Sequence, residues 1–520
     1  MARLRGVDRA DLANLALLVG VAVALRAPAL TSHGLYRDDA WPALATRTDV
    51  REAMRLGVTV PGFELALRAW LGFSRSTLWA QAPVLVASVA TVVGVYLLAR
   101  GVGLGRIAGL AAGGIMALSP VNVVYATRVK QYAFDSLGAV ALLAAAVWLW
   151  QRPGSWPRWG LVAVVAAVTG FLSASTVPVA VVAMASCAWK GLRAGDGPRR
   201  PAVVVPLAHA GLLGVYAALV LGAVPPPLRA LWGDNFVDGS SPSRLFESTV
   251  HVLDMLMAGL LYRHGPLGPV VLALVVLGAV AYRRDLAVLA VGPLAVALGL
   301  ALAERVPLGG GRTDAYLYPG LALAVAMAVQ KVLDSPPAVR LPRAFLNRSL
   351  NGLLAVGIVV FALTDGRQHV RSNPYPGADI AALQTAIRHQ MEPGDGIVVS
   401  PFSRYPWALS SPRPASIVFS PAYTTGFTVS SSEPDELIIA AEYVEGGYDP
   451  AAAVRFAAGR PRVWHVVTDT PPSDTPPEAQ AHEEDAERLL IGDGWRVVRR
   501  LDVHGAHAHL LEAPARAGAA

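Results

Sequence analysis

Two adjacent carboxylates, Asp38 and Asp39, stand near the start of the chain in the segment HGLYRDDAW at 33–41. A carboxylate can act as a general base on a hydroxyl nucleophile, or it can bind a divalent cation such as Mg²⁺ or Mn²⁺. The pair can instead cap the helix that AWPALA begins, because acidic side chains stabilise a helix N-terminus. The residues alone leave both interpretations open.

A second group of candidates lies in the segment SPVNVVYATRVKQYAFD at 119–135, where Arg128, Lys130, Gln131 and Tyr132 come close together. Cations at this place can bind an anionic group such as a lipid phosphate. Alternatively, their long side chains snorkel toward water. Asp135, one turn into the expected helix, can pair with Arg128 or Lys130.

The third group lies in the loop 304–313 and the segment LGGGRTDAYLYPG around its end. The three glycines let backbone approach a ligand closely, and the guanidinium of Arg312 can hold a phosphate through two parallel hydrogen bonds. The alternative is a plain hinge with a surface arginine. His251 and Asp254 share one face of the helix expected over 249–262. There they can line a substrate site or pair with each other.

The elements that must position these residues follow from composition. The chain has 520 residues, of which 54% are hydrophobic and 16% charged, against about 25% charged in an average soluble protein. Residues 366–520 carry 13 Arg and 19 acidic side chains, whereas residues 1–365 carry 31 basic and 18 acidic ones. We therefore expect a membrane domain over 1–365 and a soluble domain over 366–520. The basic residues punctuate apolar runs instead of clustering, so we predict no nucleic-acid partner.

The apolar runs predict a polytopic α-helical membrane protein with about eleven transmembrane helices, since a span needs about 20 mainly apolar residues. The predicted spans are 12–30, 79–99, 104–120, 131–150, 157–172, 175–190, 202–223, 267–281, 286–303, 314–331 and 349–365. The run 249–262 is short and charged, so we expect a re-entrant or surface helix there. Basic residues are about twice as dense in alternate loops, which places the N-terminus in the cytoplasm. The outer loops are then 31–78, 121–130, 224–266 and 304–313.

The same topology places residues 366–520 outside the cytoplasm. Strands are expected at 396–400, 463–467, 495–503 and 507–512, with helices at 379–391 and 480–491. This alternation predicts a small extracytoplasmic α/β domain. His504, His507 and His509 could form a metal cluster, but no Cys or acid pair accompanies them, which favours the edge of a strand.

Three segments taken together, 36–41, 119–135 and 307–320, resemble the GT-C superfamily of membrane glycosyltransferases. The shared features are an acid pair followed by Trp in the first outer loop, a Ser-Pro…Tyr…Arg…Tyr segment after the third helix, and a late Pro-Leu-Gly…Arg loop. The most similar branch holds the protein O-mannosyltransferases and the bacterial lipid A aminoarabinose transferases. This chain has Asp-Asp where the family more often has Asp-Glu, and Lys130 stands in place of a second Arg.

The resemblance implies a GT-C fold and an inverting glycosyltransferase that moves a hexose or pentose from a polyprenyl-phosphate donor to an acceptor hydroxyl. Asp38 would take the acceptor proton. Asp39 would orient Asp38, bind the sugar or join a divalent cation. Tyr36 and Trp41 would form a wall against which the sugar stacks.

The remaining candidates would bind the two substrates. Arg128, Lys130 and Arg312 would stabilise the charge that grows on the leaving lipid phosphate. The donor or its phosphate would be contacted by Gln131, Tyr132 and Tyr318, and the acceptor by His251 and Asp254. The acceptor would be a glycan, a lipid or a protein at the outer face of the cell membrane.

No Gly-rich nucleotide fingerprint follows a predicted strand, which favours a lipid-linked donor over a nucleotide sugar. Two other classes of function remain open. A transporter or lipid flippase would place ionisable residues at mid-membrane, whereas here the charges lie at the ends of the spans. A glycan ligase or phosphotransferase is the second alternative.

Overall fold

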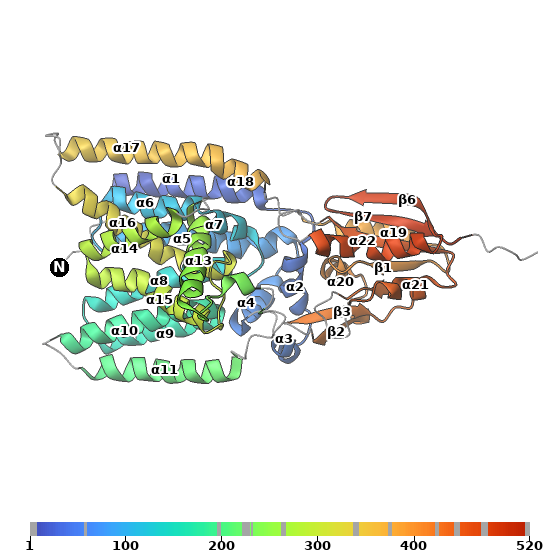
Figure 1. Ribbon diagram of the computed structural model, residues 1–520, viewed down its shortest axis with the longest axis horizontal. Helices are drawn as coiled ribbons and strands as arrows, with labels where there is room; N and C mark the ends of the chain where they lie inside the picture. The colour runs from blue at the N-terminus through green and yellow to red at the C-terminus, as the bar shows by residue number, and fades with distance from the viewer. Residues whose placement is uncertain are drawn as a thin grey trace, which may run out of the picture. The chain divides into compact units, whose positions relative to one another are not determined.

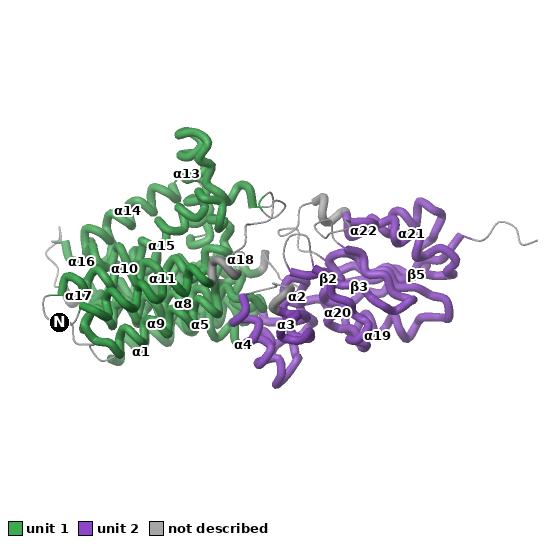
Figure 2. The backbone as a smooth tube through the Cα atoms, turned by 90° about the horizontal axis from the view of Figure 1, so that it is seen from below, with its two compact units in different colours: residues 1–28, 83–372 green, residues 29–82, 373–520 purple. Residues whose placement is uncertain are grey.

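The computed structural model describes residues 8–56, 60–194, 199–220, 229, 232–261, 267–335, 343–372, 377–421, 426–440, 448–469 and 477–514. The chain forms two compact units (Figure 2). The first, called the helical unit below, comprises residues 1–28 and 83–372. The second, the α/β unit, comprises residues 29–82 and 373–520. The segment 29–82, which carries Asp38 and Asp39, thus groups with the C-terminal part of the chain and not with the helices on either side of it.

The helical unit confirms a polytopic α-helical membrane protein (Figure 1). Each of the eleven predicted spans coincides with a helix. These helices are α1 (Arg9–Arg26), α5 (Thr77–Gly101), α6 (Arg106–Leu118), α8 (Tyr132–Trp150), α9 (Trp156–Leu172), α10 (Val177–Arg193), α11 (Arg200–Val220), α14 (Leu267–Tyr282), α15 (Arg284–Leu302), α16 (Tyr318–Asp334) and α17 (Arg343–Phe361). Residues 221–223, at the end of the seventh predicted span, lie outside the described residues.

Length and composition qualify six of the described helices as membrane spans, or seven if one bent pair is counted as a single span. The bent pair joins α6 to the segment Pro120–Thr127, which contains α7 (Pro120–Val124), at an angle of 57°. Three further apolar helices are shorter than a full span: Trp156–Leu172, Arg200–Val215 and Leu267–Tyr282. The run expected to be re-entrant belongs to α13 (Pro242–Leu261), and residues 262–266 lie outside the described part.

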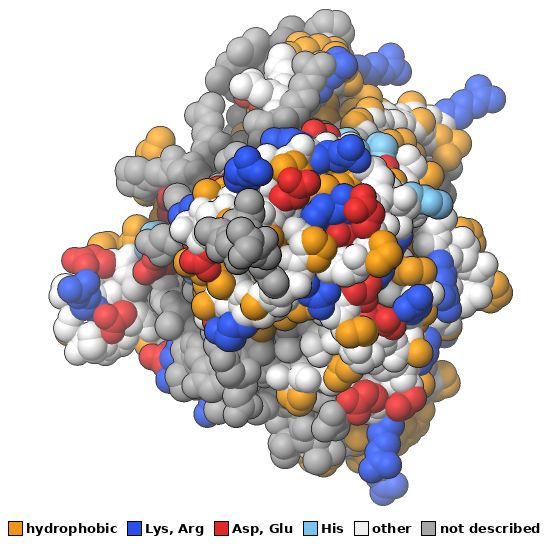
Figure 3. Space-filling view, turned by 90° about the vertical axis from the view of Figure 1, so that its right-hand side faces the viewer, with side chains coloured by type: hydrophobic (Ala, Val, Ile, Leu, Met, Phe, Trp, Pro, Cys, Tyr) orange, Lys and Arg blue, Asp and Glu red, His pale blue; other side chains and the backbone are white. Residues whose placement is uncertain are grey.

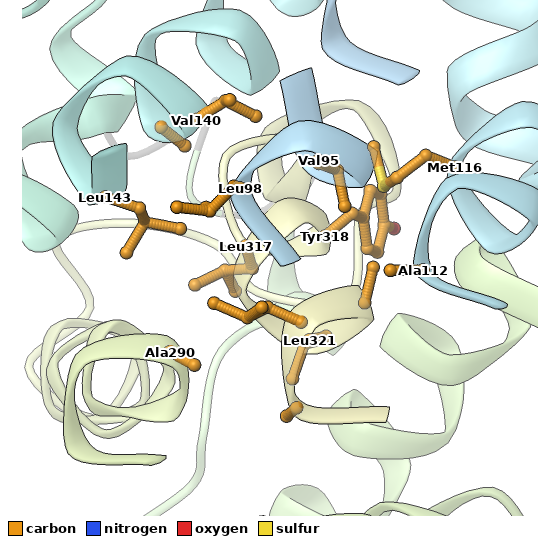
Figure 4. Close-up of a cluster of buried hydrophobic side chains, with 14 of the residues drawn as sticks. Val95, Leu98, Ala112, Met116, Val140, Leu143, Ala290, Leu317, Tyr318 and Leu321 are labelled. Carbon is orange, nitrogen blue, oxygen red and sulfur yellow. The ribbon is translucent and has the colours of Figure 1, made fainter. Parts of the chain in front are cut away.

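The core of the helical unit is close-packed around α16. Figure 4 shows side chains of α5, α6, α8 and α15 gathered around Leu317, Tyr318 and Leu321. Close approach needs small residues, since lipid tails are as apolar as leucine and helices associate through packing. Gly320 meets this need, because a Cβ at this position would overlap the carbonyl oxygen of Ala290 on α15.

The α/β unit contains a five-stranded sheet in the order β4-β1-β5-β7-β6. Strands β4 (Glu436–Ile438), β1 (Gly396–Val399) and β5 (Arg462–Thr468) are parallel. Strand β7 (Ala506–Glu512) pairs antiparallel with β5, and β6 (Arg496–Val503) pairs antiparallel with β7. A hairpin of β2 (Ile417–Pro421) and β3 (Phe427–Ser431) stands apart from this sheet. The four predicted strands correspond to β1, β5, β6 and β7. Strands β2 to β4, which are at most five residues long, were not predicted from the sequence.

Helices complete the α/β unit. From the C-terminal part come α19 (Ile380–Gln390), α20 (Arg404–Ser410), α21 (Ala451–Ala457) and α22 (Pro477–Gly492). The segment 29–82 adds α2 (Arg37–Ala45), α3 (Val50–Leu56) and α4 (Pro61–Leu71). In the face drawn in Figure 3, acidic and basic side chains are interspersed, which is the pattern of a solvated surface and not of a one-sign patch for a polyanion.

Candidate functional site

The acid pair lies in the first turn of α2. The helix follows Tyr36, whose extended backbone occupies the N-cap position without a side-chain cap. Asp38 and Asp39 are therefore inside the helix and do not cap it, although their charges favour this end. Asp39 is 3% exposed, whereas the side chain of Asp38 is 34% exposed. Successive helix positions point about 100° apart, so only Asp38 remains accessible to a substrate.

Residues of the C-terminal part contact α2 within the α/β unit. The guanidinium carbon of Arg37 lies 3.9 Å from the ring centroid of Phe402, and its Nε lies 3.8 Å from Asp38 Oδ1. Trp41 stacks on Tyr405 with ring centroids 5.9 Å apart. Gly426 has a φ of 72°, and a Cβ there would overlap the Trp41 indole. Trp41 therefore packs as an anchor for α2.

The chain that leads into α2 is also held by the C-terminal part. His33 Nδ1 lies 3.0 Å from Asp379 Oδ2, and the His33 ring stacks on His504 at 4.1 Å. The amide of Ala378 donates to the carbonyl of Gly34 at 3.1 Å. Tyr36 itself is buried, with 7% exposure. Both ends of the segment 33–41 are thus fixed against residues that are distant in sequence.

The cations of the second group lie in the helical unit, in the turn that precedes α8. Arg128 is 3% exposed and Lys130 is 7% exposed. The Lys130 amide donates to the Arg128 carbonyl at 2.6 Å, which closes a tight turn. Tyr132 packs edge-on against Tyr125 at 5.1 Å. Both cationic side chains are buried, which does not fit snorkelling toward water. Gln131, between them and α8, is half-buried.

Polar side chains tie this segment to two others in the helical unit. Ser119 Oγ donates to the carbonyl of Gly259 on α13 at 2.9 Å, and Asn122 Nδ2 donates to Ser119 Oγ at 2.9 Å. Ser136 Oγ donates to the carbonyl of Ala315 at 2.7 Å. The segment 119–135, α13 and the loop before α16 therefore converge.

The glycine-rich loop is rigid at its end. Gly309 and Gly311 have φ values of 83° and 67°, which L side chains rarely adopt. The Gly311 amide donates to Asp314 Oδ2 at 3.0 Å. Arg312, in the turn between them, lies over the Trp232 ring at 5.1 Å.

The remaining candidates differ in how far they are buried. His251 is exposed on α13, and Asp254 is half-buried one turn later beside Gly268. Tyr318 is fully buried in the core (Figure 4), and its hydroxyl has no hydrogen-bond partner among the described residues. The candidates thus fall into two sets, with Tyr36, Asp38, Asp39 and Trp41 in the α/β unit and the others in the helical unit.

Three buried carboxyls were not recognised as candidates from the sequence. Asp135 is fully buried, and within the described chain neither of its oxygens accepts a hydrogen bond. Ser173 and Ser175 face it, so Asp135 does not make the pair with Arg128 or Lys130 that the sequence allowed. Asp314 could have been noticed beside Arg312. Glu483, 2% exposed on α22, could not be recognised from the sequence, because it begins the acidic run EEDAE, which is typical of a solvated helix face.

The described residues do not assemble a metal site by themselves. No three His, Cys, Asp or Glu side chains among them come together as possible ligands. Asp38 and Asp39 occupy successive helix positions, about 100° apart, and Asp39 is buried. His507 and His509 instead contact Asp469 and Glu487, at 3.1 Å and 2.8 Å. A divalent cation stays a prediction from the sequence.

Comparison with known proteins identifies similar structures only. The sequence matches no protein-family model and no curated protein. The structure is similar to ArnT from Cupriavidus metallidurans in the apo state, with a TM-score of 0.53, 13% identity, and coverage of 96% of this chain and 98% of that chain. The structure of the same protein bound to undecaprenyl phosphate is similar with a TM-score of 0.54 and 14% identity, and the match covers 96% of this chain and 97% of that chain. The apo oligosaccharyltransferase of Archaeoglobus fulgidus matches with a TM-score of 0.45 and 12% identity, over 93% of this chain and 83% of that chain.

Proposed function

Because this chain has the GT-C fold of membrane glycosyltransferases over nearly its whole length, we propose that it is an inverting glycosyltransferase. It moves a sugar from a polyprenyl-phosphate donor to an acceptor hydroxyl of a glycan, lipid or protein. The reaction takes place at the outer face of the cytoplasmic membrane, with the N-terminus in the cytoplasm and the C-terminal part outside.

The observation that carries this proposal is the position of Arg128 and Lys130, two cationic side chains in the turn before α8 of a unit built from apolar helices. Side chains of this kind hold a phosphate through charge-assisted hydrogen bonds. The ArnT structure of this fold was solved with undecaprenyl phosphate bound. A lipid phosphate is an anion that a membrane protein encounters at the ends of its helices, and it suits both cations.

The chemistry follows as a single displacement. Asp38 accepts the proton of the acceptor hydroxyl while that oxygen forms a bond to the anomeric carbon. The bond between the anomeric carbon and the phosphate oxygen breaks, and the electron pair leaves with the lipid phosphate. The configuration at the anomeric carbon inverts. Arg128, Lys130 and Arg312 stabilise the negative charge that the phosphate gains.

The other candidates take supporting roles in this proposal. Asp39 is buried in the first turn of α2, where it orients Asp38. Gln131 and Tyr132 adjoin the two cations and contact the donor. His251 and Asp254 lie on the acceptor side. Tyr318, inside the core, acts through packing.

The test uses the purified full-length chain in liposomes that contain polyprenyl-phosphate hexoses and pentoses. We expect mass spectrometry to detect free polyprenyl phosphate and a glycosylated acceptor with wild-type protein and neither with Asp38→Asn. Transbilayer movement of uncleaved lipid would favour a flippase instead, and release of polyprenyl pyrophosphate would favour a ligase. A parallel assay with EDTA tests the divalent cation.

A further inference from the structure

Glu483 connects α22 to the end of β1 inside the α/β unit. Its Oε1 accepts a hydrogen bond from the Phe402 amide at 2.7 Å, and its Oε2 accepts one from the Ser400 hydroxyl. Ser400 Oγ also lies 2.9 Å from Ser403 Oγ, which donates to Thr468 Oγ1 at 3.3 Å. Ser400 follows β1 and Thr468 ends β5. One buried carboxyl therefore fixes the loop that leaves the carboxyl end of the parallel strands.

This loop carries the ring on which Arg37 rests. The Arg37 guanidinium lies over Phe402 at 3.9 Å, an attractive cation–π arrangement. The charges of Arg37 and Arg404 both favour the ionised form of Glu483 and so lower the pKa that burial raises. Arg37 Nε in turn lies 3.8 Å from Asp38 Oδ1. Glu483 and Asp38 are thus linked through Phe402 and Arg37.

The geometry of α2 explains why this link matters. Arg37 and Trp41 are four residues apart, so they share one helix face. Both contact the C-terminal part of the unit, Arg37 on Phe402 and Trp41 on Tyr405. Asp38 is rotated by about 100° from Arg37, and its side chain is 34% exposed. Two anchors on one face therefore set the direction in which Asp38 points.

We propose that Glu483 is a positioning residue for Asp38, acting through the Phe402 loop and the Arg37 guanidinium. The inference rests on the proposed function, in which Asp38 is the general base. It gives the C-terminal part of the chain a defined task in the reaction: it holds the helix that bears the base.

The test compares Glu483→Ala with Glu483→Gln and Glu487→Ala in the full-length chain. The Gln amide still accepts from the Phe402 N–H, so it should keep kcat within about 3-fold of wild type, whereas Ala should lower kcat by about 10- to 100-fold with the donor KM unchanged. Glu487 is a matched control because it lies one turn along α22 and contacts His465 and His509, away from Phe402.

Hydrogen exchange of the α2 amides, residues 37–45, supplies a readout that does not depend on activity. Glu483→Ala should speed this exchange and Glu487→Ala should not. If α2 exchanges as in wild type, or if Glu487→Ala lowers kcat equally, the positioning role is overturned. Faster α2 exchange with unchanged kcat would support the contact and overturn the role of Asp38. Should Glu483→Ala fail to fold, Phe402→Leu removes the ring while keeping the amide and must give the same pattern.

Discussion

In the helical unit, Arg128 and Lys130 occupy a turn between helices that are close in sequence, and hydrogen bonds from Ser119 and Ser136 tie this region to its neighbours. In the α/β unit, Asp38 lies on a helix whose contacts come from Phe402 and from the aromatic rings around Trp41, at the far end of the chain. The candidates in the helical unit are thus positioned by neighbouring helices of that unit. Asp38, in the α/β unit, is positioned by residues that come from the C-terminal part of the chain.

This difference suggests a division of tasks. The helical unit supplies buried positive charge, which suits a phosphate that stays with its lipid. The α/β unit supplies a half-exposed carboxylate on a rigid support, which suits proton transfer from an acceptor that varies in size. Variants in the two units should therefore fail in different kinetic parameters.

The largest expected effect is that of Asp38→Asn in the α/β unit. The amide cannot accept the hydroxyl proton, so kcat should fall by about 10³-fold. Binding of polyprenyl phosphate, measured by retention on the purified protein, should be unchanged. Asp49→Asn is the matched control, since Asp49 caps α3 in the same unit through the Glu52 amide. Transfer by Asp38→Asn at more than a tenth of the wild-type rate would contradict the assignment.

The second effect belongs to the helical unit. Arg128→Ala should lower kcat/KM for the donor by about 10²-fold, because the leaving phosphate loses a charge-assisted partner in its transition state. Binding of polyprenyl phosphate should weaken as well, unlike in Asp38→Asn. The exposed Arg244 on α13 provides a control, and Arg244→Ala should remain close to wild type. Unchanged lipid binding in Arg128→Ala would remove the proposed division between the units.

Most of the helical unit and four of the strands could be predicted from local features of the sequence. Apolar runs predicted the helices of the helical unit, because each run of about 20 residues must satisfy its own backbone in lipid. The segments 119–135 and 304–313 were chosen from their cations and glycines, and packing against α13 brings them together. The strands β1, β5, β6 and β7 followed from β-branched and aromatic runs.

Long-range contacts could not be predicted in the same way. Nothing in HGLYRDDAW indicates that Arg37 will rest on Phe402 or that Trp41 will fill the space beside Gly426. Glu483 belongs to an acidic run of ordinary appearance, and only the fold shows that its side chain is buried against β1. Asp135 does not make the pair that the sequence allowed, because proximity in sequence does not decide which helix face a carboxyl occupies.

A third, smaller effect is expected for Arg312, in the loop before α16 of the helical unit. Arg312→Ala should raise the donor KM by about 10-fold, because a guanidinium that binds phosphate is lost from a loop that Asp314 holds rigid. Arg305 lies exposed on the same loop, and Arg305→Ala should change the donor KM by less than about 2-fold. Equal effects of the two variants would mean that Arg312 contributes only general positive charge.

The smallest effect is a pH dependence confined to the α/β unit. Burial raises the pKa of Glu483 from 4.5 to about 7, so the folded state binds more protons than the unfolded state between these values. The contribution of Glu483 to stability should therefore be greatest below pH 4.5 and fall by up to about 3 kcal/mol as the pH rises to 7. The ionisation of Glu487 changes stability in the opposite direction. Burial raises its pKa, but hydrogen bonds with His465 and His509 lower it to about 2. The stability that Glu487 contributes is therefore lost as the pH falls below 4.5. Protection of the α22 amides, corrected for intrinsic exchange, should thus decline from pH 5 to 7.5 in wild type and in Glu487→Gln but much less in Glu483→Gln. The same decline in Glu483→Gln would show that this carboxyl does not control the unit, and the support for α2 would then have to come from the Trp41 anchor alone.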